Sequence, residues 1–442
     1  MDHSPAFRFR RLLNWFPLGM TYAALYMGRY NLTVAQGALG TLISKVSFGE
    51  IFALGAVVYG LAFVINGPLT DRWGGRRAML VAAAGAADAN LSMGFAVWHA
   101  LLGGLGKQAL LTTLAVLYGL NMYFQSFGAV AIVKVNAHWF HLQERGKFSG
   151  IFGIMIASGI FLAFDLNERL LRMLKGTGAG GIDPNWHVFI IPGCILAALC
   201  LFEFIFLRNQ PSDAGLPDFD TGDASSGEDG PPPAPFQLMK RILTHPVLLT
   251  IALVEFCTGV LRNGVMHWFR IYAKEQLAVH SGNPRAWDFA LSNWGLLLMV
   301  AGIIGGMSAG YVSDLFFQSR RAPAAFFLYS LLTACCGAMA FSLHSAWPLV
   351  VLVFLISVAV IGTHGLLSGT ATMDFGGRRA AATAVGVIDG FVYLGTGLQS
   401  YALGWITTKD WGWWPLFLLP WGVLGTLLLT RIWHARPGKG GH

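Results

Sequence analysis

Two arginines stand inside long apolar stretches of this sequence. Arg29 is the only charged residue between Arg11 and Lys45, and Arg262 lies in the stretch "GVLRNGVMHWF". An arginine near the centre of a bilayer costs at least ~2.5–3.5 kcal/mol, so each needs a compensating interaction. The planar guanidinium pairs well with the oxygens of phosphate or carboxylate groups. Two such residues in this setting therefore indicate joint binding of an anion.

Tyrosines accompany the first arginine at helical spacing. Tyr22, Tyr26 and Arg29 are four and three residues apart, so one helix face presents two phenolic hydroxyls and a guanidinium. A permanent ion pair is the alternative role for each arginine. Arg29 has no acidic residue on its own helix, whereas Arg262 could pair with Glu255 or Asp389.

Two further titratable residues lie in apolar segments. His364 is a candidate substrate ligand or proton-sensitive group, and it could equally be a neutral residue bonded to a neighbouring helix. Asp389 lies one turn before Tyr393 and is a candidate for coupling transport to protons. A salt bridge from Asp389 to Arg29 or Arg262 is the other reading.

The elements that must position these residues are membrane-spanning helices. The chain has 442 residues, of which 55% are hydrophobic and 12% charged. Segments of about 20 apolar residues, the length that crosses a bilayer, follow one another along nearly the whole chain. They predict an all-α membrane protein with twelve transmembrane helices. The predicted spans are 12–37, 48–70, 77–98, 108–136, 148–166, 187–208, 246–273, 290–313, 322–342, 348–373, 380–402 and 412–433.

The distribution of basic residues predicts the orientation of these helices. The two termini and alternate loops carry twice as many Lys and Arg residues as the other set of loops. This bias places both termini in the cytoplasm, and it explains the formal charge of +8 without a nucleic-acid partner. The first apolar run is too long for a signal peptide, so the first helix is expected to remain.

The chain divides into two related halves. The segment "NQPSDAGLPDFDTGDASSGEDGPPPAPFQ" is rich in Pro, Gly, Ser and Asp, which is typical of a linker. We expect a six-helix half at 1–208, a cytoplasmic linker at 209–241 and a second half at 242–442. Two such repeats with a site between them form a transporter architecture.

A loop motif recurs in the two halves. "GPLTDRWGGRRAML" is echoed by "GYVSDLFFQSRRAP", and each has Gly, three residues, Asp and then an arginine pair. These residues can bridge helix ends across the two halves and stabilise an outward-facing state. Simple positive-inside anchoring is the alternative for the arginines. The predicted conformational latch consists of Gly67, Asp71, Arg72, Arg76, Arg77 and Asp314.

No motif indicates catalysis. The five cysteines lie inside predicted helices without metal-ligand spacing, and no nucleophile, phosphate-binding loop or cofactor fingerprint is found. We therefore expect a protein that is not an enzyme and that holds neither a metal nor a cofactor.

Several stretches carry a family resemblance. "GPLTDRWGGRR" resembles the signature loop of the major facilitator superfamily. "YAALYMGRYNL", "YFQSFG", "QPSDAGLP", "VLRNGVMHWFRIYAKE" and "RRAAATAVGVIDGFVYLGTG" resemble, in order, the organophosphate:phosphate antiporters. The resemblance implies that Arg29 and Arg262 bind the phosphate group together. It also implies that Tyr22, Tyr26 and Tyr393 line the site.

The chain departs from that family at several positions around the site. Characterised members carry Lys, His, acidic, acidic and Tyr residues at five positions, and a Lys beside the first arginine. In this chain those positions hold Phe63, Ile156, His267, Met299, Gly362 and Tyr30, respectively. The arginine pair is thus expected in a more apolar site, which puts the identity of the solute in question.

These observations predict a monomeric carrier of the bacterial inner membrane. It would move a phosphorylated solute in exchange for inorganic phosphate by alternating access. A proton-coupled symporter of a carboxylate such as a sugar acid is one alternative. A sensor that binds a sugar phosphate without transporting it is another.

Overall fold

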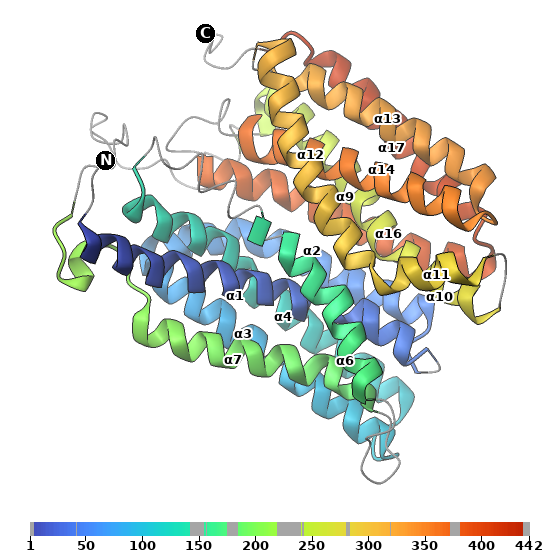
Figure 1. Ribbon diagram of the computed structural model, residues 1–442, viewed down its shortest axis with the longest axis horizontal. Coiled ribbons are helices and arrows are strands. Elements are labelled where there is room, and N and C mark those ends of the chain that lie inside the picture. The colour runs from blue at the N-terminus through green and yellow to red at the C-terminus, as the bar shows by residue number, and fades with distance from the viewer. Residues whose placement is uncertain are drawn as a thin grey trace.

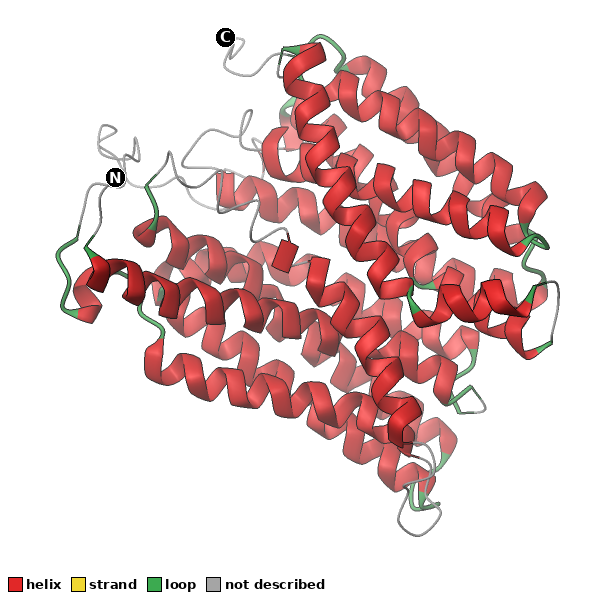
Figure 2. Ribbon diagram, viewed as in Figure 1, coloured by secondary structure: helices red, strands yellow, loops and turns green. Residues whose placement is uncertain are grey.

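The computed structural model describes residues 4–40, 42–141, 154–155, 157–174, 184–218, 240, 243–279, 283–318, 320–371 and 381–435. Within these ranges all the regular secondary structure is helical, as Figure 2 shows. The N-terminal half contains α1 (Pro5–Ala38), α2 (Lys45–Trp73), α3 (Gly75–Leu101), α4 (Lys107–Trp139), η1 (Leu162–Leu166), α6 (Asn167–Leu174), η3 (Pro184–Trp186) and α7 (His187–Phe206). After η4 (Pro211–Ala214), the C-terminal half contains α9 (Pro246–Met266), α10 (Trp268–Ala278), α11 (Pro284–Ser292), α12 (Trp294–Phe317), α13 (Arg321–Ser342), α14 (Ala346–His364), η6 (Gly365–Ala371), α16 (Ala381–Lys409) and α17 (Trp413–Arg431).

Each of the twelve predicted spans is helical over most of its described residues, although the helices end earlier than predicted at 207–208 and 432–433 and are interrupted at 267 and 293. The fifth span is the least complete, because most of its first half lies outside the described ranges. The seventh is divided into α9 and α10 at His267. Nine helices of the described chain are long and apolar enough to cross a membrane. The expectation of an all-α membrane protein is confirmed.

Local sequence accounts for several helix starts. The Ser44 hydroxyl accepts a hydrogen bond from the backbone N–H of Ser47 at 3.1 Å and caps α2. Proline is the first residue of α1, α9 and α11, where its missing N–H leaves no intrahelical bond unmade. The helix interiors then follow from the apolar runs, because the bilayer offers the backbone no other hydrogen-bond partner.

The helices form two bundles that meet along α2 and α16. In the N-terminal half α1, α3 and α4 pack with α2 and α7, and α9 and α12–α17 pack among themselves. The start of α1 and the end of α17 lie toward one end of the molecule, and α10 and α11 lie toward the other (Figure 1). We call the latter the far end. The proposed linker falls mostly on residues 219–239, outside the described part, so the domain boundaries stay a prediction.

Glycines on one face of α2 show how the spacing between α2 and α16 changes along the two helices. A Cβ on Gly49 would lie 2.4 Å from the carbonyl oxygen of Ser400 on α16, and one on Gly60 would lie 3.0 Å from that of Gly390. A Cβ on Gly67, two turns further, would meet no atom of the described residues within 4 Å. Because these three positions share one helix face, α2 and α16 are in close contact toward the far end and separate toward the termini.

Polar contacts close the far end. Lys45 on α2 lies 3.1 Å from a carboxylate oxygen of Glu275 on α10 and donates to the carbonyl oxygen of Thr407. Asp165 in η1 accepts hydrogen bonds from two backbone N–H groups at the start of α12, those of Gly295 at 2.6 Å and Leu296 at 2.8 Å. An acid from one half thus caps a helix of the other.

One ion pair reinforces this closure. Glu168 at the start of α6 pairs with Arg270 of α10, which is 4% exposed. Glu168 lies beyond the predicted fifth span. Burial favours the neutral form of its carboxyl, but the charges of Arg270 and Lys274 outweigh burial and lower the pKa to about 2. The carboxylate is therefore charged, and the far end is held by charged as well as helix-capping contacts.

Candidate functional site

Arg29 is fully buried and bound only by neutral groups among the described residues. Its Nε donates to the side-chain oxygen of Gln125 at 2.9 Å, and its two terminal nitrogens donate to the hydroxyls of Tyr393 at 2.8 Å and Tyr59 at 3.0 Å. The guanidinium also lies over the ring of Tyr26, 4.7 Å from its centroid. Three of the five N–H groups of a guanidinium are used in this way. Its positive charge has no carboxylate partner in the described part of the chain.

Arg262 shows the same pattern in the second half. It donates a hydrogen bond of 3.4 Å to the hydroxyl of Tyr30, and no ion pair of the described residues includes it. Each arginine therefore reaches a tyrosine of the opposite half: Arg29 contacts Tyr393, and Arg262 contacts Tyr30. A permanent pair with Glu255 or Asp389 is absent among these contacts, which favours an anionic ligand as the missing partner.

The predicted tyrosines form a ladder on α1. The rings of Tyr22 and Tyr26 are 5.5 Å apart, and those of Tyr26 and Tyr30 are also 5.5 Å apart, each pair edge to face. Spacing of four residues stacks these rings along one face of the helix. Their phenols give the site neutral donors beside Arg29.

A network of amides holds the backbone of α1 in place. Asn121 donates to the carbonyl oxygen of Gly28 and accepts from Gln125 and Asn90, all at 3.0 Å. The hydroxyl of Tyr118 donates to the carbonyl oxygen of Arg29 at 2.9 Å. A buried, connected polar network of this kind holds its members in place, so it fixes the position of the guanidinium.

Five rings separate the arginines from the far end. His267 lies against Tyr30, Phe52, Phe164 and Phe48 with centroid distances of 4.8, 4.5, 5.8 and 6.4 Å. We call this group the aromatic plug. The imidazole Nδ1 is 2.7 Å from the hydroxyl of Thr33, which joins the plug to α1. All five rings of the plug are buried, each no more than 2% exposed.

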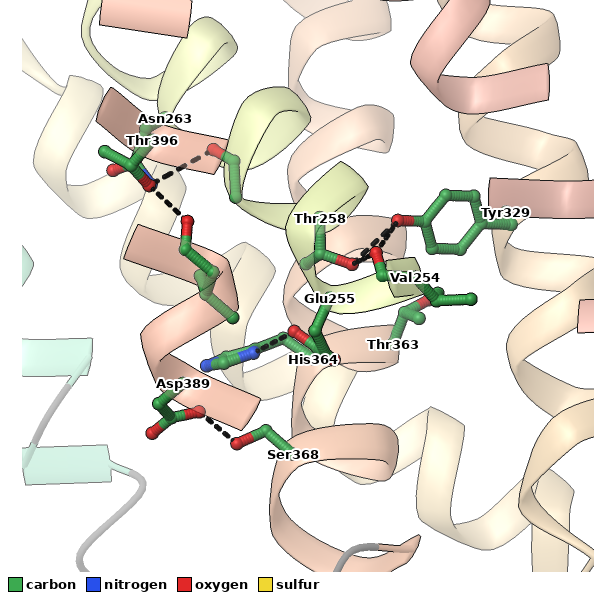
Figure 3. A network of polar contacts seen from close by, with 12 residues as sticks. Val254, Glu255, Thr258, Asn263, Tyr329, Thr363, His364, Ser368, Asp389 and Thr396 are labelled. Atoms are coloured by element: carbon green, nitrogen blue, oxygen red, sulfur yellow. Dashed lines mark hydrogen bonds and ion pairs between the residues drawn. The ribbon is translucent and has the colours of Figure 1, made fainter. Parts of the chain in front are cut away.

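The second half contributes an acid–base pair near Arg262. Figure 3 shows the imidazole of His364 with its Nδ1 2.8 Å from an oxygen of Glu255. Asp389 accepts a hydrogen bond from the hydroxyl of Ser368, which lies in η6 just after His364. His364 is 23% exposed, whereas Glu255 is fully buried.

The departures from the resembling family have structural roles. Phe63 packs on the rings of Tyr59 at 4.7 Å and Tyr393 at 6.2 Å. Met299 receives a hydrogen bond from Ser158, and a Cβ on Gly362 would lie 2.7 Å from the carbonyl oxygen of Gly305. A larger residue than glycine is therefore excluded where α12 and α14 touch. Ile156 lies outside the described residues.

The predicted latch is only partly described. The Arg76 side chain donates to the carbonyl oxygen of Phe204 at 2.6 Å, and Asp314 pairs with Arg321 at 2.6 Å within its own half. Arg76 and Arg77 also border a cavity of about 570 Å³, whose other lining residues are Trp73, Arg208, Asn209 and Asp213. Arg72 is exposed, and the side chain of Asp71 is outside the described part. No described residue lies within 4 Å of a Cβ placed on Gly67, so the close helix contact expected there stays a prediction.

Sequence reasoning missed several residues of the site. Tyr59, Gln125 and Tyr118 contact Arg29 from α2 and α4, and Glu255 binds His364 instead of an arginine. A polar residue inside an apolar span was the available signal for each of them. A polar residue in an apolar span does not show which other helix it contacts. Those contacts are known only from the packing of the helices in the structure.

Comparison with known proteins gives a consistent family. The model described as Major Facilitator Superfamily matches residues 18–400. The chain is 24% identical to the glycerol-3-phosphate transporter of Bacillus subtilis, over 97% of this chain and 94% of that protein. It is also 24% identical to the membrane sensor protein UhpC of Escherichia coli, over 93% and 90% of the two chains. A third relative at 24% is a probable hexose phosphate transport protein of Chlamydia pneumoniae, over 97% and 92%.

Solved structures agree on the fold. A bacterial homologue of the human lysosomal transporter Spinster superposes with a TM-score of 0.70 at 14% identity, covering 99% of this chain and 100% of the other. The proton:xylose symporter XylE superposes with a TM-score of 0.67 at 13% identity, covering 98% and 97%. At these identities the likeness concerns the fold alone.

Proposed function

Because the chain belongs to the major facilitator superfamily, we propose that it is a membrane carrier that exchanges an organophosphate for inorganic phosphate. One observation carries the proposal: each half has an arginine inside the bundle, Arg29 fully buried and Arg262 partly buried, and both are bound among the described residues only by neutral groups. The names of three relatives, which refer to glycerol 3-phosphate, hexose phosphate and a membrane sensor, support an organophosphate ligand. We place the protein in a bacterial inner membrane, as a monomer with both termini in the cytoplasm.

The crossed arginine–tyrosine contacts suggest how the ligand is coupled to movement. Without a ligand, Arg29 binds Tyr393 and Arg262 binds Tyr30, so both charges are held by phenols of the opposite half. A phosphate group would replace these neutral partners with charge-assisted, bidentate hydrogen bonds. The carrier would then reorient readily only when an anion neutralises both arginines, which is the requirement for exchange.

The test uses purified protein in liposomes loaded with radiolabelled phosphate. Efflux is followed when glycerol 3-phosphate, hexose phosphates or phosphonates are added outside, at equal pH on both sides. Arg29→Lys and Arg262→Lys keep a positive charge and remove the planar fork. Hydrogen bonds to charged groups contribute about 1.5–3 kcal/mol, so each variant should exchange roughly 10- to 150-fold more slowly.

Arg285→Lys is the matched control, because Arg285 is exposed on α11 at the far end. Its exchange should equal that of the unmodified protein. Full exchange by Arg29→Lys would contradict the role of the arginine pair.

The sensor reading is separated by the same vesicles. A sensor binds an organophosphate without releasing phosphate from the liposomes. Binding measured by calorimetry, together with absent efflux, would favour it. If neither binding nor efflux is found and a carboxylate is accumulated instead, the carboxylate symporter would be favoured.

A further inference from the structure

Glu255 and His364 form a buried acid–base pair that the exchange mechanism does not use. The Glu255 carboxyl is fully buried between helices. One of its oxygens lies 2.8 Å from His364 Nδ1, and the other, Oε1, has no hydrogen-bond partner among the described residues. A buried carboxylate oxygen without a donor is costly, so this is not a fully satisfied structural ion pair. An added proton would lower that cost.

The pair lies within reach of the anion site. Glu255 and Arg262 are seven residues apart on α9, which places them about two turns, or roughly 10 Å, apart along the same face. The Glu255 carboxyl is influenced by the charges of His364, Asp389 and Arg262. Figure 3 shows His364 and Asp389 on neighbouring helices next to Glu255. His364 is the last residue of α14, directly before the π-helical segment η6. Segments of this kind are frequent at functional sites.

Other titratable groups face the pair from the elements packed around α9. Tyr329 of α13 bonds to Thr258 and to the backbone of Val254, and Tyr393 of α16 bonds to Arg29. Helix α17 brings no titratable side chain before Arg431 at its end. Arg270, Tyr272, Lys274 and Glu275 of α10 lie toward the far end. His364 is the group whose ordinary pKa lies nearest to neutral pH.

A proton bound by Glu255 and His364 would change the net charge at the anion site. Among the described residues of this half, Glu255, His364 and Asp389 are titratable groups near Arg262. A proton added to the pair of Glu255 and His364 raises the net charge of the site by one, which favours binding of an anion. By linkage, a proton that strengthens anion binding is itself bound more strongly when the anion is present.

We propose that Glu255 and His364 bind a proton together with the anionic solute, so that a proton gradient drives net uptake when no exchangeable phosphate is present. This inference rests on the proposed function, because it needs an anion at Arg29 and Arg262. In the proton-bound state His364 Nδ1–H donates to one oxygen of Glu255, and the added proton is carried by His364 Nε2 or by Glu255 Oε1, the oxygen that otherwise has no partner among the described residues. Release of the solute removes the favourable charge and releases the proton on the same side of the membrane.

The experiment uses liposomes free of phosphate, with a pH-sensitive dye enclosed. Glycerol 3-phosphate or glucose 6-phosphate is added outside, and uptake and internal acidification are recorded together. Acidification that follows uptake is expected, and uptake should rise with an acidic exterior. Between high and low pH, affinity should change by about 5- to 150-fold, the range typical of coupled sites.

Two variants and one control test whether Glu255 and His364 carry the transported proton. His364→Asn and Glu255→Gln should lose the acidification and lose the pH dependence that exceeds the solute's own titration near pH ~6. His344→Asn changes an exposed histidine of the same half and should behave as the unmodified protein. Unchanged acidification by His364→Asn would overturn the assignment.

Failure of the inference and failure of the proposed function give different results. Phosphate exchange without any acidification in the unmodified protein overturns proton coupling alone. Absent exchange with every organophosphate overturns the proposed function. If both variants fail to fold, calorimetry of glycerol 3-phosphate binding to the unmodified protein decides, in buffers of different ionisation enthalpy. Proton uptake on binding supports the pair, and its absence overturns it.

Discussion

At the scale of single residues, the described partners of Arg29 are all neutral, and we therefore propose that its charge is available to a ligand. Gln125 accepts the Nε hydrogen bond at 2.9 Å and is itself held by Asn121. An amide positions a guanidinium without neutralising it, whereas a carboxylate at the same place would do both. The difference between the two is one atom in the side chain.

Gln125→Glu should therefore abolish phosphate exchange while the protein still folds. The new carboxylate would form a buried ion pair with Arg29 and compete with the anion. Exchange in liposomes and the thermal unfolding midpoint are measured together. Gln108→Glu, an exposed position on the same helix α4, is the control and should retain exchange. Undiminished exchange by Gln125→Glu would contradict the role of Arg29 as an anion ligand.

At the scale of elements, the packing of α2 against α16 determines which end of the molecule is closed. The glycines of α2 allow backbone contact near the far end, where even a methyl group at position 49 would lie 2.4 Å from a carbonyl oxygen. On the same helix face, a Cβ at Gly67 would meet no atom of the described residues within 4 Å. In an alternating-access carrier, the end at which α2 and α16 are in contact must open when the end at which they are apart closes.

Gly49→Ala should open the far end. The added methyl group cannot be accommodated without separating α2 from α16, which shifts the population toward the opposite conformation. Spin labels at positions 108 and 344, exposed sites in opposite halves at the far end, would report a longer distance. Gly306→Ala on α12, where a Cβ meets nothing within 4 Å, is the control for the general gain in helix propensity.

Asp165 stabilises the same closed end through a helix cap. Asp165→Ala removes the acceptor for the N–H groups of Gly295 and Leu296, and loss of a cap costs about 0.5–2 kcal/mol. The closed population should fall roughly 2- to 30-fold relative to the open one, as measured by the same spin-label distance. Asp288→Ala, which removes an exposed pair of 3.7 Å with Arg172, should have little effect. Equal effects of the two variants would argue against the cap.

At the scale of the whole molecule, closure is a balance between two conformations, and pH is expected to act on it through Glu168. Its pKa is about 2 with the far end closed, against an ordinary value of 4.5. Above about pH 4.5 the Glu168 carboxylate is ionised in both states, so its pairing with Arg270 contributes fully to the stability of the closed state. That contribution is lost as pH falls from 4.5 toward 2.

The far end of the unmodified protein should thus stay closed from pH 7 to about 5 and open progressively below 4.5. Glu168→Gln should be more open at pH 7 and should lack this acid-dependent change. Both are read from the distance between labels at 108 and 344. An identical acid response in the two proteins would assign the transition to another group.

The residue types alone predicted much of this protein. Apolar runs of bilayer length predict the helices, because only helices satisfy the backbone in this way in lipid. Arg29 and Arg262 stand out because a charge inside such a run needs a partner. Neither inference requires knowledge of which helices touch.

Tertiary structure decided the partners. Arg29 is bound by Gln125, Tyr59 and Tyr393 from three other helices, and Glu255 binds His364 instead of an arginine. These contacts depend on the rotation and spacing of helices far apart in the sequence, which are set by close packing at positions such as Gly49 and Gly60. The chain by itself fixed which groups need a partner, and packing of the two halves decided which partner each one has.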